Sequence, residues 1–170
     1  YILKSNLRGV RGLILRGIKM WNEEMIINLF FQKHKKERLL WELSTNKREE
    51  ALKSLHDLKY VKKEIMHSIP YYTEKYLEKE LGKFGNFTNV YYMGLSYTGM
   101  LPLKKAIERS REEDEGCIIY CGEGIGYCHT DHEEGAPLAY LLKVKNYRDI
   151  EKNYDCTFGT EGIEEWMLHE

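Results

Sequence analysis

Three short segments between residues 22 and 61 carry apolar residues at helical spacing, and this pattern constrains the fold more than any other feature of the chain. The first segment follows Asn22, a residue type that caps helix N-termini, and Glu23 and Glu24 favour the positive end of the helix dipole. Its apolar side carries four residues: Met25, Ile26, Leu29 and Phe30. The pattern predicts a helix that ends near Lys35.

The second and third segments continue the same pattern. The second carries Leu39, Leu40 and Leu43 and stops at three turn-forming residues, Ser44-Thr45-Asn46. The third begins at Lys47 and predicts a helix over about 47–58, with four residues on its apolar side: Ala51, Leu52, Leu55 and Leu58. Because the strand-prone pair Tyr60-Val61 follows, the region predicts a helix-turn-helix backed by a strand.

The region from Asn22 to Arg109 resembles the winged helix-turn-helix family. Its second half, NVYYMGLSYTGMLPLKKAIE from Asn89 to Glu108, resembles the wing strand and closing helix of that family. The resemblance implies that the helix at about 47–58 enters the major groove of double-stranded DNA. It also implies a set of base-reading residues: Asn46, Lys47, Arg48, Glu50 and Lys53.

An insertion separates the two halves of this match, because about 25 residues lie between residues 63 and 90. Thr73 predicts the N-cap of a helix within the insertion, and Gly82 and Gly85 predict its end. The inserted helix is either an elaboration of the domain or an arm through which a homodimer reads two half-sites.

Charge is distributed unevenly along the chain, whose formal net charge is −1. Residues 1–84 hold 18 Lys and Arg against 11 Asp and Glu, whereas residues 85–170 hold 8 against 16. A basic first half suits phosphate contacts. The candidate phosphate-binding residues are Lys33, Lys35, Lys36, Arg38, Lys62 and Lys63. The alternatives are that the two halves neutralise each other across an internal interface, or that these side chains form a solvated face.

Two further units flank the winged-helix-like domain, which we place at residues 22–110. Residues 1–21 have a basic amphipathic pattern, which indicates a helix that packs on the domain, binds a membrane surface or binds nucleic acid. Residues 111–170 are acidic and contain four strand-like runs, at 117–121, 125–128, 138–144 and 163–168. They predict a small α/β or mostly β C-terminal unit.

All four cysteines lie in this C-terminal unit, and two histidines stand close to them. Thiolate and imidazole are the ligands that zinc prefers, so Cys121, Cys128 and His132 are candidate zinc ligands. A hairpin over the glycines at 122–126 would bring Cys121 opposite Cys128. The alternatives are a disulfide or redox pair, a cysteine nucleophile with a histidine base, and buried cysteines that only pack.

The sequence as a whole therefore predicts an α+β protein: a winged helix-turn-helix with an inserted helix in the wing, followed by the C-terminal unit. The expected function is DNA binding as a cytoplasmic transcriptional regulator, since no apolar run approaches the length of a membrane span. Two alternatives stay open: an enzyme whose active site lies in the Cys/His-containing unit, and a winged-helix module that binds another protein.

Overall fold

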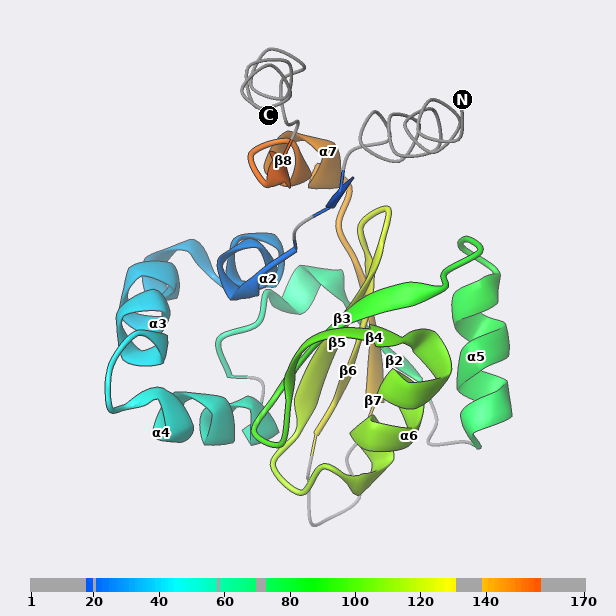
Figure 1. The fold of residues 1–170 in the computed structure, drawn as a ribbon, viewed down its shortest axis with the longest axis horizontal. Coiled ribbons are helices and arrows are strands. Elements are labelled where there is room, and N and C mark those ends of the chain that lie inside the picture. The colour runs from blue at the N-terminus through cyan, green and yellow to red at the C-terminus, as the bar shows by residue number, and fades with distance from the viewer. Residues whose placement is uncertain (1–17, 20, 58, 70–72, 131–138, 157–170) are drawn as a thin grey trace, which may run out of the picture.

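The computed structural model describes residues 18–19, 21–57, 59–69, 73–130 and 139–156 (Figure 1). These residues form an α+β fold, as predicted, with six α-helices and a six-stranded antiparallel sheet. The helices are α2 (Glu23–Phe30), α3 (Lys36–Leu43), α4 (Arg48–Lys53), α5 (Glu74–Gly82), α6 (Leu103–Glu112) and α7 (Tyr147–Glu151). The strands of the sheet are β2 (Met66–Ile69), β3 (Asn89–Gly94), β4 (Thr98–Pro102), β5 (Cys117–Gly122), β6 (Ile125–His129) and β7 (Ala139–Lys143). Shorter elements are the 3-10 turns η1 (Lys33–Lys35), η2 (Ser54–Asp57) and η3 (Lys63–Ile65), and a strand pair of β1 (Ile18–Lys19) with β8 (Asp155–Cys156).

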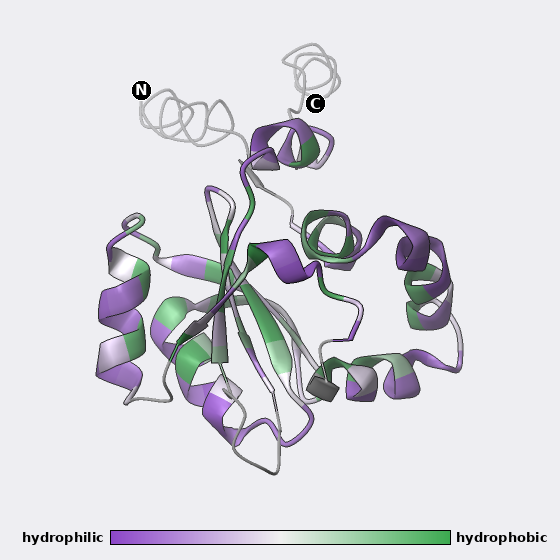
Figure 2. Ribbon diagram, turned by 180° about the vertical axis from the view of Figure 1, so that it is seen from behind, coloured by the Kyte–Doolittle hydropathy of each residue, from purple (hydrophilic) through white to green (hydrophobic). Residues whose placement is uncertain are grey.

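The sheet has the strand order β2-β7-β6-β5-β3-β4 and separates two hydrophobic cores. Helices α5 and α6 cover one face, and α2, α3 and α4 pack on the other (Figure 1). Successive side chains of a strand point to opposite faces, so on β5 Ile119 joins the first core and Ile118 and Tyr120 join the second. Strands β5 and β6 are buried along their whole length, and the outer turns of the helices carry hydrophilic residues (Figure 2).

Helix α2 begins where the sequence predicts. The Asn22 side-chain oxygen accepts a hydrogen bond from the backbone N–H of Met25 at 3.0 Å, which confirms Asn22 as the N-cap. The helix ends at Phe30 and not near Lys35, because Phe31 adopts an extended backbone and forms an isolated antiparallel bridge with Val61. The predicted strand at 60–61 is therefore this single bridge, and η1 follows α2 as a separate turn.

Close packing holds α2 against the sheet at Gly126 of β6. A Cβ atom at Gly126 would lie 2.7 Å from the Phe30 ring and 2.8 Å from the Ile119 carbonyl oxygen. The missing side chain lets the Phe30 ring reach the strand, where it also makes an edge contact with Tyr120 at a centroid distance of 5.6 Å.

The turn between α3 and α4 uses the residues that the sequence singles out. The Ser44 hydroxyl donates to the Trp41 carbonyl at 2.9 Å, and the Thr45 hydroxyl donates to the Glu42 carbonyl at 3.1 Å. The next helix starts at Arg48, as expected, but it is shorter than predicted: α4 ends at Lys53, and η2 continues to Asp57.

The predicted wing lies inside the central sheet. Strand β4 is an edge strand, whereas β3 pairs with β4 on one side and with β5 on the other. The sheet thus continues across residue 110, where the sequence places a boundary between units. The inserted helix is confirmed as α5, and its N-cap is Thr73, whose hydroxyl accepts from the Tyr76 N–H at 3.4 Å.

Strands β5, β6 and β7 confirm three of the four strand-like runs of the C-terminal region. Residues 123 and 124 form the turn between β5 and β6, and both have positive φ, 55° and 76°. A Cβ at Gly124 would stand 2.2 Å from the Val144 carbonyl oxygen, so glycine is required there.

Some expectations fall outside the described residues. These are the run at 163–168 and the amphipathic helix at 1–21, except that Ile18 and Lys19 are extended in β1 rather than helical. Within the described part of the chain, no helix combines the length and the apolar character needed to cross a bilayer.

Candidate functional site

The C-terminus of α2 binds two lysine side chains that come from different segments of the chain. Its last four carbonyls, at residues 27–30, have no partner inside the helix and must bond to other donors. In chain order they accept from the Phe31 N–H at 3.1 Å, the Lys36 Nζ at 2.9 Å, the Lys62 Nζ at 3.4 Å and the Lys62 N–H at 2.8 Å. Two lysine ammonium groups therefore sit at the negative end of the α2 dipole, where cations are stabilised.

The same arrangement brings two distant basic segments side by side. The Phe31–Val61 bridge and a hydrogen bond from the Gln32 N–H to the Tyr60 carbonyl, at 2.8 Å, join residues 31–36 to residues 59–63. We call the five lysines that these segments gather the lysine surface: Lys33, Lys35, Lys36, Lys62 and Lys63. All five are among the residues that the sequence predicts to bind phosphate.

Exposed Glu37 and Glu64 directly follow Lys36 and Lys63 in the chain, but neither forms an ion pair with the lysine surface. In the described residues, no acidic side chain lies within ion-pair distance of any of the five lysines. Burial lowers the pKa of Lys36, and the charges of Lys62 and Lys33 lower it further. Lys35 instead lies over the Tyr60 ring, 5.0 Å from its centroid. Like charges are thus held close together, and an anion would relieve their repulsion.

Three of the other predicted basic residues, Arg38, Arg48 and Lys53, have acidic partners. Arg38 pairs with Glu42 at 2.9 Å, and Lys53 pairs with Glu49 at 2.9 Å. Arg48 donates to both carboxylate oxygens of Glu23, and these hydrogen bonds raise the Arg48 pKa. Arg48 also donates to the Leu43 carbonyl at 3.3 Å, so its side chain fastens α4 to α2 and α3.

The start of α4 presents both basic and acidic side chains. Asn46 and Lys47 are exposed, and Lys47 lies over the ring of Trp41 with its Nζ 5.5 Å from the centroid. However, the exposed side of the helix also carries Glu49 and Glu50, which repel phosphates. The structure therefore places Asn46 and Lys47 just before α4 and the other predicted base readers on it, and Lys47 is the only one of their basic side chains without an ion pair in the described residues.

Two of the three candidate zinc ligands, Cys121 and Cys128, do not lie together. Cys121 belongs to the core beneath α5 and α6, whereas Cys128 belongs to the core beneath α2, so their thiols lie on opposite faces of the sheet. Cys128 pairs with Ile118 and not with Cys121 in the β5–β6 hairpin. His132 lies outside the described residues. No group of three or more potential metal ligands is found in the part of the chain that the structure describes.

The buried cysteines are also unsuited to nucleophilic catalysis. Burial raises the pKa of Cys117 and of Cys121 to about 12, and it raises the pKa of Cys128 well above its ordinary value. These groups are therefore neutral thiols near pH 7. Among the described residues, Cys117, Cys121 and Cys128 are free of disulfide bonds.

Sequence reasoning missed two buried carboxylates that fasten elements together. Glu113 accepts hydrogen bonds from the Tyr92 hydroxyl at 2.7 Å and from the backbone N–H and hydroxyl of Ser96, which ties the β3–β4 hairpin to the end of α6. Glu151 accepts from Tyr120 and so anchors α7 to the sheet. In the sequence both residues stand among other charged residues, as Glu113 does in REEDEG. A buried glutamate in such a run cannot be told from an exposed one by sequence alone.

Comparison of the chain with protein-family models, with curated proteins and with solved structures finds no match.

Proposed function

We propose that this protein binds nucleic acid, and double-stranded DNA in particular, by holding backbone phosphates on the lysine surface. One observation carries the proposal: five lysines from two distant segments are held together without a carboxylate partner among the described residues. Lysines that neutralise phosphates release condensed counterions, and this release supplies the sequence-independent part of DNA affinity.

Part of the lysine surface is ordered before any DNA arrives. Lys36 and Lys62 each use one ammonium hydrogen on a carbonyl of α2, so up to two remain for a phosphate oxygen. Lys33 and Lys63 are exposed beside them and can follow the backbone of a duplex. A preordered cation loses less side-chain freedom on binding than a mobile one.

The winged-helix resemblance supports the same function, but we propose a different surface for the main DNA contact. The order of α2, α3 and α4, joined by short connections, agrees with a helix-turn-helix, and we keep that interpretation as part of the proposal. We place the main DNA contact at the lysine surface and not on α4, because Arg48 and Lys53 are paired with carboxylates and Glu50 is exposed. Binding should therefore depend weakly on base sequence.

An anionic membrane is the competing partner for a basic surface. Membrane-binding surfaces combine lysines with exposed apolar side chains that enter the lipid. In the part of the chain that the structure describes, the exposed large hydrophobic residues are Trp41, Tyr97 and Met100, and none belongs to the two lysine-bearing segments. This distribution favours nucleic acid.

The test is a change of three lysines that do not bond to α2: Lys33→Gln, Lys35→Gln and Lys63→Gln together. The matched control is Lys75→Gln, Lys79→Gln and Lys104→Gln, which removes the same charge from exposed positions on α5 and α6. Fluorescence anisotropy with a labelled 20-base-pair duplex measures the affinity at fixed salt.

We expect the first variant to lose about tenfold or more in affinity and the control to change little. Equal losses in both variants would show that net charge alone causes the binding. Binding to phosphatidylserine vesicles in the absence of any binding to DNA would contradict the proposal in favour of a membrane.

A further inference from the structure

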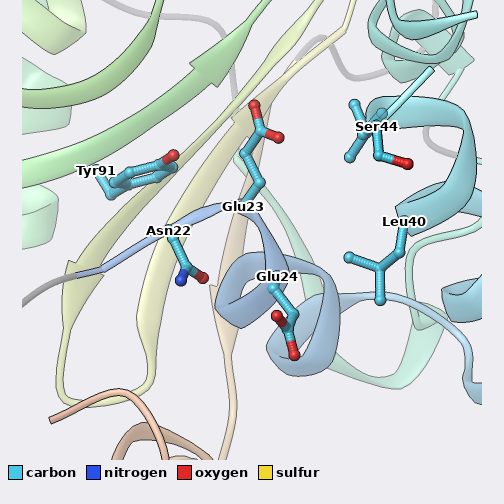
Figure 3. A pocket seen from close by; sticks show the side chains of 7 residues that line it. Asn22, Glu23, Glu24, Leu40, Ser44 and Tyr91 are labelled. Atoms are coloured by element: carbon cyan, nitrogen blue, oxygen red, sulfur yellow. The ribbon is translucent and has the colours of Figure 1, made fainter.

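We draw no further inference here: the strongest candidate, the open pocket of about 330 Å³ between the N-terminus of α2, the C-terminal half of α3 and strand β3 (Figure 3), owes its charge to Glu23 and Glu24 at a helix N-terminus, the first of them already bound by Arg48, and no second feature of the described residues points to a ligand there.

Discussion

Single residues determine where the helices of this protein begin. Asn22 and Thr73 both accept a hydrogen bond from a backbone N–H three residues later, and both are recognisable in the sequence because capping depends on local geometry. The end of α2 is not recognisable in this way. It is determined by the bridge between Phe31 and Val61, residues that are 30 positions apart in the chain.

The cap at Asn22 can be measured by substitution. Asn22→Ala should lower the free energy of unfolding by about 1 kcal/mol, because the Met25 N–H loses its acceptor. Urea denaturation measures the change. The control is Asn146→Ala, since Asn146 precedes α7 but makes no side-chain capping bond. Equal losses in the two variants would mean that the Asn22 bond contributes nothing specific.

The reaction rate of the buried thiols should depend on pH. A pKa of about 12 for Cys117 and Cys121 leaves a thiolate fraction on the order of one in ten thousand at pH 8. In a Cys156→Ser background, the native protein should react very slowly with a disulfide reagent, and all three thiols should react rapidly in urea. The native rate should still be rising at pH 10. A plateau near pH 9 would show that burial does not control these groups.

At the scale of secondary structure, the sequence predicts helix positions better than it predicts what each helix does. The start of α4 near Lys47 follows from the turn at residues 44–46 and the periodic apolar residues after it. The role of Arg48 does not, because its partner Glu23 lies 25 residues away and on another helix. A family resemblance implies a base reader there, and the geometry instead makes the guanidinium a link between helices.

Arg48→Gln separates these two roles. We expect it to lower the free energy of unfolding by about 0.5–1 kcal/mol, a small value because the pair is partly exposed. Its effect on DNA affinity should be less than about twofold. Lys33→Gln should show the opposite pattern, with weaker DNA binding and unchanged stability, since Lys33 has no ion-pair partner in the described chain. Strong loss of DNA binding in Arg48→Gln would instead indicate that α4 contacts the DNA bases.

At the scale of the whole molecule, strand pairing joins regions that the sequence alone divides. Alternation along β5 predicts that Cys117 and Cys121 share one face, but the face of Cys128 depends on the register of a hairpin with a two-residue turn. In the same way, each of β2 and β3 from the first region pairs with a strand from beyond residue 110. Local patterns contain no information about these partners.

A truncated chain tests this connection. A fragment of residues 1–110 lacks β5, β6 and β7, so β2 has no neighbour and β3 keeps only β4. We expect the fragment to be largely unfolded, with poorly dispersed amide signals in its ¹H–¹⁵N NMR spectrum and no cooperative urea transition. A well-dispersed spectrum would show that residues 22–110 form an independent domain.

The salt dependence of DNA affinity tests the central claim most directly, because it counts the phosphate contacts themselves. For the wild type, the logarithm of the association constant should fall linearly with the logarithm of salt concentration. For the variant with Lys33, Lys35 and Lys63 changed to Gln, the slope should be less steep by about 2 to 3, and the control with Lys75, Lys79 and Lys104 changed should keep the wild-type slope. Identical slopes for all three proteins would contradict the assignment of the lysine surface as the DNA-binding site.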